Sequence, residues 1–312
     1  MRLAALTVLA CPVCKQELHP VLPPSPEIAV GTLVCATGAH RFLIRSGIPE
    51  LVRPERIASV EAFATSLSLA WTRDGWGSTD EEYLMKIPAR DVTHRRSAEW
   101  KVKERSEHAL LFLVDSLKPR RVVDLGSGVG WLARDMATRG LEVFALDASM
   151  NEQVGLLAAN VYIRRGTYFE RVRGEMDEPP FLDHSVDLVV CNASLHYAPS
   201  IDIVLREIAR MLRTNGTCVI MNSPVHRDER SARRAEESFR NHLSALGATD
   251  RVVQSYHHFT RSALDEMVGK FVGPLAEIAY EPGVGFRLTR RLKGILLGME
   301  LASFPILYAR RS

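Results

Sequence analysis

The sequence predicts an α/β protein built on a doubly wound, mostly parallel sheet, with a small metal-binding ribbon at its N-terminal end. Three observations predict this fold. Residues 122–140 read as a strand, a glycine loop and a helix; residues 141–147 read as a second apolar strand; and cysteines cluster near the start. The 312 residues, 46% of them hydrophobic, are ordinary for a globular protein with one large or two modest domains.

Composition and charge argue against two classes of partner. The net charge is +3, and no segment concentrates the basic charge that strong nucleic-acid binding needs. No apolar run approaches the roughly 20 residues that cross a bilayer, so we expect no membrane span. The opening MRLAALTVLAC is similar to a short lipoprotein signal, but its apolar core is short for one.

The first chemical motif is a pair of metal-binding knuckles. CPVC at residues 11–14 and CATGAH at residues 35–40 offer three thiolates and one imidazole. Cys11, Cys14, Cys35 and His40 would close a tetrahedral Zn²⁺ site with no open position, which indicates a structural ion. The alternatives are that the cysteines are core residues, or that His19 supplies the imidazole. With five cysteines in all, these roles fit a reducing cytoplasm.

The segment RFLIRSGIPELV follows at residues 41–52. Together with CPVC, Cys35 and His40, it resembles the small zinc-ribbon module that serves as a free activator subunit of some tRNA and translation-factor methyltransferases. The same module is fused ahead of some bacterial methyltransferases. We therefore predict a zinc-ribbon module over residues 1–57.

Residues 58–118 are predicted to form a helical linker or lid, because apolar and charged positions alternate without a phosphate or metal signature. Five large aromatic residues stand out there, and we expect them mainly to pack, with a lid over a ligand as the alternative. They are Phe63, Trp71, Trp76, Tyr83 and Trp100. The charged run PARDVTHRRSAEWKVKER, at residues 88–105, reads as a solvated helix face.

The glycine loop lies in RVVDLGSGVGW, residues 121–131. Gly126, Gly128 and Gly130 let the backbone turn tightly beneath a ligand that faces the helix N-terminus. The dinucleotide fingerprint needs a third glycine where this chain has Trp131, so that reading fails. An acid two residues before G-x-G-x-G instead resembles motif I of the class I S-adenosylmethionine-dependent methyltransferases, whose sheet is Rossmann-like.

Two further stretches carry the same resemblance. Asp147 ends the second strand, where a carboxylate accepts both ribose hydroxyls of an adenosyl ligand. In the segment RVRGEMDEPPF, residues 171–181, alignment on Pro180 and Phe181 makes Glu175 the contact for the adenine amine and Asp177 its rival. The resemblance implies that S-adenosyl-L-methionine is held by Asp124, Gly126, Ser127, Gly128, Gly130, Asp147, Ala148, Glu175, Met176 and Asn192.

The remaining segments complete the predicted domain, residues 119–312. Residues 201–224 read as an amphipathic helix, a turn and a fifth strand, and Cys191 and Cys218 fall inside strands as core residues. FPILYARR, residues 304–311, is expected to add the last strand at the sheet edge. Residues 226–303 read as an insertion that helps to form the acceptor pocket.

The sequence favours methyl transfer to O, N or C of a small-molecule acceptor from a biosynthetic or cell-envelope pathway. His196, just past the fourth strand, is the candidate general base, with Tyr197 beside it to orient the acceptor. The alternative for His196 is a packing role. An rRNA guanine methyltransferase is the second hypothesis, because some of these enzymes carry a similar ribbon, and a non-catalytic binding or activator module is the third.

Overall fold

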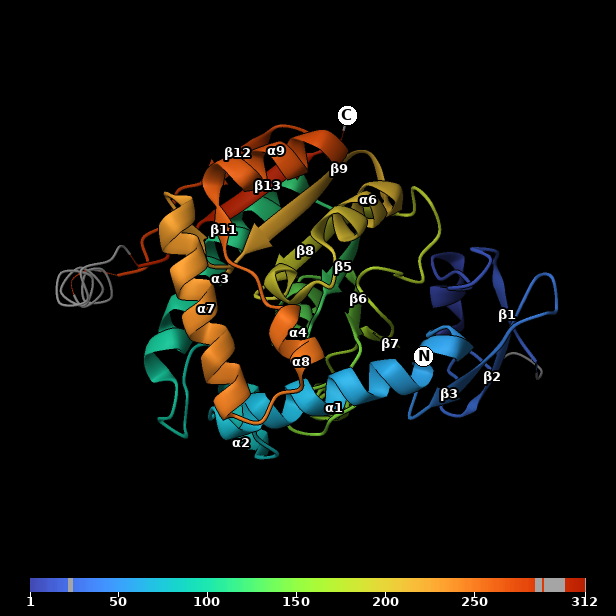
Figure 1. Cartoon of the computed structure of the whole chain (residues 1–312). Coiled ribbons are helices and arrows are strands. Elements are labelled where there is room, and N and C mark those ends of the chain that lie inside the picture. Colours follow the sequence, from blue (N-terminus) through green and yellow to red (C-terminus); the bar gives the residue numbers. More distant parts are fainter. Residues whose placement is uncertain (22–24, 284–287, 289–300, 312) are drawn as a thin grey trace.

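The computed structural model describes residues 1–21, 25–283, 288 and 301–311 (Figure 1). Its main sheet has seven strands in the order β12-β13-β9-β8-β5-β6-β7. These are β5 (Arg121–Leu125), β6 (Glu142–Asp147), β7 (Glu170–Arg173), β8 (Val186–Asn192), β9 (Leu212–Met221), β12 (Leu275–Ile278) and β13 (Ile306–Arg310). Strands β5 to β9 pair in parallel, so the predicted doubly wound α/β sheet is confirmed.

The last strand differs from the prediction in its position. β13 pairs antiparallel with both β9 and β12, so it lies inside the sheet and β12 forms the edge. β12 is only four residues long, and its sequence LAEI carries no strand signal strong enough to have been recognised.

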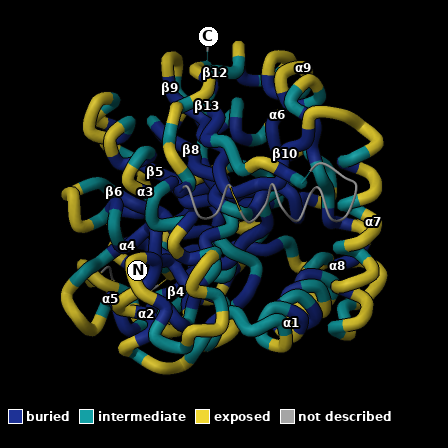
Figure 2. The backbone as a smooth tube through the Cα atoms, turned by 90° about the vertical axis from the view of Figure 1, so that its left-hand side faces the viewer, coloured by how far each residue is buried: buried dark blue, intermediate teal, exposed yellow. Residues whose placement is uncertain are grey.

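Helices cover both faces of the sheet, and the strands send alternate residues to each side. Val123 and Leu125 of β5 join a core that includes α6 (Ile201–Met211) and α9 (Arg261–Phe271). Val122 joins a second core that includes α4 (Trp131–Ala137), α5 (Asn160–Arg164), α2 (Glu81–Lys86) and α3 (Ser97–Leu117). Figure 2 shows the buried strands between helices whose outer surfaces are exposed. This burial on both faces explains the continuous apolar runs in the strands.

The segment predicted to be a helical linker or lid contains three helices. They are α1 (Ile57–Arg73), α2 (Glu81–Lys86) and α3 (Ser97–Leu117). The segment before the last strand contains β10 (Val225–His226), α7 (Glu229–Ala245), α8 (Asp250–Gln254), β11 (Phe259–Thr260), α9 and β12. Much of the remainder of the predicted insertion lies outside the described residues. Among the helices that the structure describes, none is both long and apolar enough to span a membrane.

The N-terminal ribbon is a four-stranded antiparallel sheet that follows the short helix η1 (Leu3–Thr7). Its strands are β1 (Leu18–Pro20), β2 (Gly31–Cys35), β3 (Arg41–Arg45) and β4 (Ile48–Pro49). In β3, Phe42 and Ile44 are buried, whereas Arg41, Leu43 and Arg45 are exposed. These buried side chains belong to the same core cluster as Phe144 and Phe181 of the large domain, so the ribbon and the sheet share one core.

The ribbon docks on the β7 edge of the large sheet. Glu50 pairs with Arg173 of β7, and the amide of Leu51 donates to the Arg173 carbonyl at 2.8 Å. Further along, the Ala10 amide donates to the carbonyl of Pro180 at 2.9 Å. Backbone hydrogen bonds therefore fix the ribbon to an edge that would otherwise be left unpaired.

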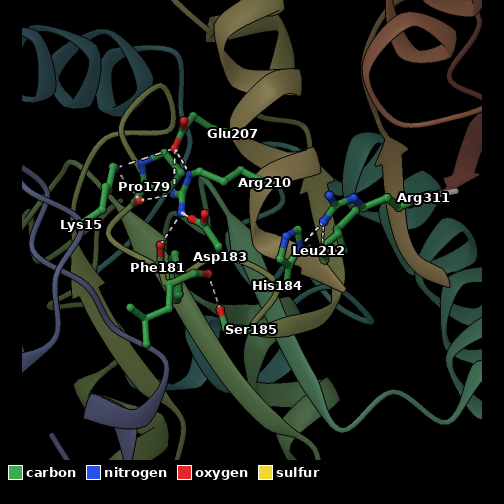
Figure 3. A network of polar contacts seen from close by, with 11 residues as sticks. Lys15, Pro179, Phe181, Asp183, His184, Ser185, Glu207, Arg210, Leu212 and Arg311 are labelled. Atoms are coloured by element: carbon green, nitrogen blue, oxygen red, sulfur yellow. Dashed lines mark hydrogen bonds and ion pairs between the residues drawn. The ribbon is translucent and has the colours of Figure 1, made fainter. Parts of the chain in front are cut away.

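Side chains reinforce this interface around the loop before β8 (Figure 3). Lys15 Nζ, from the first knuckle, donates to the Pro179 carbonyl at 3.3 Å and pairs with Glu207 at 3.7 Å. Arg210 of α6 donates to the carbonyls of Phe181 and Pro179 at 2.7 and 3.2 Å. The knuckle and α6 thus hold the same loop from two sides.

One buried guanidinium attaches the linker to the large domain and gives a stability prediction. Arg134 of α4 donates to the carbonyls of Leu84, Met85 and Ile87 at 2.8–3.2 Å. We expect Arg134→Met to lower the free energy of unfolding by about 3 kcal/mol, because the carbonyls of Met85 and Ile87 lose the guanidinium donor and that of Leu84 keeps only the Tyr162 hydroxyl. Urea unfolding measures this change. Arg164→Met, at an exposed ion pair on α5, is the control and should change stability by less than about 0.5 kcal/mol.

Candidate functional site

A cavity of about 220 Å³ lies at the carboxyl ends of β5, β6 and β8. In an open parallel sheet, ligands bind at this edge. Most of the residues predicted to bind a cofactor line the cavity: Gly126, Ser127, Gly128, Asp147, Ala148, Glu175, Met176 and Asn192. Asp124 and Gly130 do not line it. Gly130 is the N-cap of α4, with φ at +73°, and Asp124 is buried within β5.

The glycine loop is held in place by a carboxylate from the neighbouring strand. Asp147 Oδ2 accepts from the Gly128 amide, and Oδ1 accepts from the Ser149 amide, both at 2.8 Å. Gly126 has φ at +80°, and a Cβ there would lie 2.5 Å from Cβ of Ser194. Only glycine therefore fits this position. Asp147 lies on the cavity wall with its orientation fixed by two backbone donors.

Glu175 and its rival Asp177 both line the cavity and share one arginine. Arg56 Nη2 lies 2.6 Å from Glu175 Oε1 and 3.0 Å from Asp177 Oδ2. Burial and the charge of Asp177 raise the pKa of Glu175 to about 7, and Arg56 opposes that rise. Arg56 belongs to the short helix η2 (Pro54–Arg56), directly after the ribbon, so the ribbon's exit segment reaches the cavity wall.

The linker aromatics form much of the cavity wall. Phe63, Trp71, Trp76, Tyr83 and Trp100 all line the cavity, so the interpretation that they mainly pack is incomplete. Trp76 and Trp100 meet edge to face, with ring centroids 5.7 Å apart. The linker therefore closes the cavity on the side away from the sheet, as the alternative of a lid requires.

A second cavity of about 420 Å³ adjoins the first. The two share Trp71, Trp76, Lys103, Ala193 and Tyr197 as lining residues. Aromatic rings dominate the wall of the second cavity, contributed by Trp71, Trp76, Tyr197, Phe239, Tyr256 and Phe304. Phe239, Leu243, Leu246 and Tyr256 come from the predicted insertion, whereas Phe304 belongs to the segment of the predicted last strand. The two cavities are therefore adjacent and share part of their lining.

His196 lines only the second cavity, whereas Tyr197 lines both. His196 Nδ1 lies 3.0 Å from the Ser223 hydroxyl. Burial lowers the pKa of His196 to about 3, with smaller contributions from the nearby charges of His258 and Lys103. The imidazole is therefore neutral at physiological pH, but a pKa this low makes it a weak base, so general-base catalysis requires a bound ligand that raises the pKa of His196.

Sequence reasoning missed Lys103, which lies in the run interpreted as a solvated helix face. That interpretation is wrong for this residue, because its side chain lines both cavities. The available signal was its position three residues after Trp100, which puts both side chains on one face of α3.

The predicted metal ligands come together in the ribbon. The ligand atoms of Cys11, Cys14, Cys35 and His40 all lie within 4.8 Å of one another. His40 Nδ1 is 3.5 Å from Cys11 Sγ and 3.4 Å from Cys35 Sγ. Tetrahedral Zn²⁺, with bonds of roughly 2.3 Å to sulfur and 2.1 Å to nitrogen, separates its ligands by about 3.5–3.8 Å. The rival His19 is exposed on β1 and is not part of the cluster.

Comparisons with known families cover both parts of the chain. Residues 123–220 match the family described as a methyltransferase domain, and residues 2–47 match the family described as Trm112p-like protein. The chain thus carries a methyltransferase domain behind a Trm112p-like module. The second match agrees with the ribbon, and the first spans β5 to β9.

Two individual relatives match over less than half of the chain. The chain is 30% identical to the biotin biosynthesis bifunctional protein BioHC of Cellvibrio japonicus over 35% of its own length and 21% of that protein. It is 27% identical to the uncharacterized methyltransferase YcgJ of Bacillus subtilis, over 43% of this chain and 51% of that one. The chain thus spans between about a fifth and a half of these relatives.

Among solved structures, geranyl diphosphate C-methyltransferase from Streptomyces coelicolor matches with a TM-score of 0.52 and 16% sequence identity. The match covers 79% of this chain and 98% of that one. At this identity the likeness shows that the two proteins share a fold.

Asp124 gives a prediction about pH and stability. Neither of its carboxylate oxygens has a hydrogen-bond partner among the described residues, and burial together with the charge of Asp147 raises the pKa of Asp124 to about 7. Because an unfolded aspartate has a pKa near 3.9, the folded state binds the extra proton between pH 4 and 7. Stability should therefore fall as pH rises through that window.

We expect Asp124→Asn to remove this slope. The variant should match the wild type below pH 4, where Asp124 is protonated in the folded and unfolded states, and exceed its free energy of unfolding by roughly 2–4 kcal/mol at pH 7.5. Urea unfolding across this range measures the difference. A difference independent of pH would contradict the assignment.

Proposed function

We propose that this methyltransferase domain, joined to its Trm112p-like module, is an S-adenosylmethionine-dependent methyltransferase that acts on a small-molecule acceptor. The observation that carries the proposal is the pair of adjoining cavities with a shared aromatic wall, one of them lined by the glycine loop and Asp147. Methyl transfer from a sulfonium is an in-line displacement, so two ligands must meet end to end with water excluded.

The first cavity fits the methyl donor. In this proposal Asp147 accepts the ribose hydroxyls, since its carboxylate is already oriented by two amides. Glu175 or Asp177 accepts the adenine amine, and Met176 lies beside the ring. Bound there, S-adenosyl-L-methionine would supply an electrophilic methyl group. The remaining loop residues hold the ligand through close backbone approach.

The second cavity fits the acceptor. His196 is the proposed general base for a hydroxyl, amine or acidic carbon, since its neutral imidazole lines this cavity and hydrogen bonds to Ser223. Tyr197 is proposed to orient the acceptor, because it lines both cavities. The segment 226–303 contributes Phe239, Leu243, Leu246 and Tyr256 to the lining, which supports its assignment as part of the acceptor pocket.

A cavity with six aromatic side chains in its lining favours a small molecule over an rRNA guanine. RNA recognition relies on splayed bases and a basic surface that follows the phosphates. The second cavity is lined mainly by apolar and aromatic residues, which suits a compact acceptor instead. The third hypothesis, a non-catalytic module, is tested by the binding experiment below.

The Cys/His cluster is proposed to hold a structural Zn²⁺. Three thiolates and one imidazole complete four-coordinate zinc, which leaves no position for a substrate. The ribbon is a unit of fewer than 60 residues, too small to build an extensive core alone, and a metal ion is the usual means of fixing such a fold.

The donor assignment predicts a loss of binding in one variant. Asp147→Ala should weaken S-adenosylmethionine at least tenfold in calorimetric titration, because the ribose loses a charged acceptor. Asp147→Asn should lose affinity as well while keeping the side chain's size. Asp202→Ala, at a half-exposed ion pair on α6, is the control and should bind like the wild type.

Two outcomes of that titration would overturn the assignment. Wild-type affinity in both folded Asp147 variants would remove the ribose role. If the well-folded wild type bound neither S-adenosylmethionine nor S-adenosylhomocysteine, the hypothesis of a non-catalytic module would replace the hypothesis of an enzyme.

The zinc assignment predicts a change in metal content. Cys11→Ser should reduce bound zinc well below one equivalent in elemental analysis and lower the melting temperature of the chain, because one of four ligands is lost. His19→Ala is the matched control, since His19 lies outside the cluster, and it should retain the wild-type zinc content. Stoichiometric zinc in the Cys11 variant would rule out the four-ligand set.

A further inference from the structure

Lys103 of α3 lies where the two cavities meet, since it lines both of them. Its ammonium nitrogen lies 5.1 Å from the ring centroid of Trp76 and 5.5 Å from that of Trp100. Two indole faces therefore hold the cation by cation–π attraction and keep it at the junction. The side chain is thus fixed at the point where donor and acceptor would approach each other.

The other charged groups that line the second cavity are already paired. Arg96 pairs with Asp74 at 2.5 Å and with Glu99 at 3.2 Å. Lys103 has neither a hydrogen bond nor an ion pair among the described residues, and Glu99, one helical turn away, is engaged by Arg96. Burial lowers the pKa of Lys103 to about 8, and Glu99 only partly offsets it. Among the described residues that line the second cavity, Lys103 is therefore the cation that has no ion-pair partner.

We propose that Lys103 is the receptor for an anionic group, a carboxylate or a similar oxyanion, on a ligand that occupies these cavities. The inference rests on the proposed methyltransferase function and names a binding residue for it. An ammonium that two indole rings partly shield from water, and that has no ion-pair partner, gains from a negatively charged partner. The anion has two possible sources, which are the amino-acid carboxylate of the methyl donor and an acidic group on the acceptor.

The surroundings of Lys103 argue for ligand binding over a packing role. A lysine that only covers apolar surface extends its ammonium into bulk water. Here the charge points instead among Trp76, Trp100 and the two cavities, close enough to His196 to help lower the pKa of that imidazole. An anion at this position would stabilise the charge of Lys103 and would offset the effect of that charge on the pKa of His196.

The test compares two pairs of probes that differ in an anionic group. S-adenosylhomocysteine and 5′-methylthioadenosine share an adenosyl thioether, but only the first carries the amino-acid carboxylate. 8-Anilinonaphthalene-1-sulfonate and N-phenyl-1-naphthylamine share an aromatic body, but only the first carries a sulfonate. Each is titrated into the full-length wild type, Lys103→Met and Lys103→Arg. Lys101→Met, at an exposed position on the same helix, is the control.

If the anion belongs to the donor, Lys103→Met should weaken S-adenosylhomocysteine at least tenfold and leave 5′-methylthioadenosine within twofold. If it belongs to the acceptor, the variant should bind both adenosyl probes normally and lose the wild-type preference for the sulfonate probe. Lys103→Arg should retain the affinity that Lys103→Met loses. This result would show that the loss in Lys103→Met comes from the missing charge and not from misfolding. Unchanged affinity of the folded Lys103→Met variant for all four probes overturns the proposal.

Failure of the Lys103 proposal can be distinguished from failure of the proposed methyltransferase function. If the wild type bound neither adenosyl probe, the methyltransferase assignment would fail. The naphthyl pair would still report on Lys103, because it depends on the second cavity. If the wild type bound neither adenosyl probe and bound the two naphthyl probes with equal affinity, the proposal that Lys103 binds an anion would fail as well.

Discussion

The pairing of the segment after β4 with the edge strand β7 is the constraint on which much of the molecule depends. A parallel sheet has to cover its edges, and the ribbon is too small to bury its own apolar face. Glu50 and Leu51 satisfy both needs, because their backbone extends the sheet at Arg173 while Phe42 and Ile44 join the core around Phe144. The two modules are therefore parts of one folding unit and share a hydrophobic core.

That docking also brings the ribbon's exit segment to the first cavity. Three residues beyond Arg53, Arg56 reaches both Glu175 and Asp177, while Arg53 pairs with Glu178 at 2.9 Å. Without these guanidinium groups, three carboxylates would crowd a partly buried loop, and mutual repulsion would favour their protonation. The ribbon therefore supports the cavity through electrostatics, although its own Cys/His cluster lies on another part of the module.

Sequence patterns were sufficient to select candidate residues at positions that only one or a few residue types can occupy. Gly126 needs a positive φ beside Ser194, Asp147 must end a strand beside the glycine loop, and CPVC places two thiols on one knuckle. Short or mixed signals were not sufficient. The four residues of β12 resemble a loop, and Lys103 resembles any solvated lysine, because its role depends on Trp76, which precedes it by 27 positions and meets it only in the folded chain.

The charged groups of the site are distributed unevenly between the two cavities. Asp147, Glu175 and Asp177 line only the first cavity, Lys103 lines both, and the neutral His196 lines only the second, where Arg96 pairs with Asp74 and Glu99. A sulfonium loses its positive charge as the methyl group leaves, so a nearby fixed cation disfavours the bound donor more than the neutral product. An anion on Lys103 would neutralise that cation. If the acceptor supplies this anion, its binding would favour binding of the donor, so the two ligands would support each other's binding.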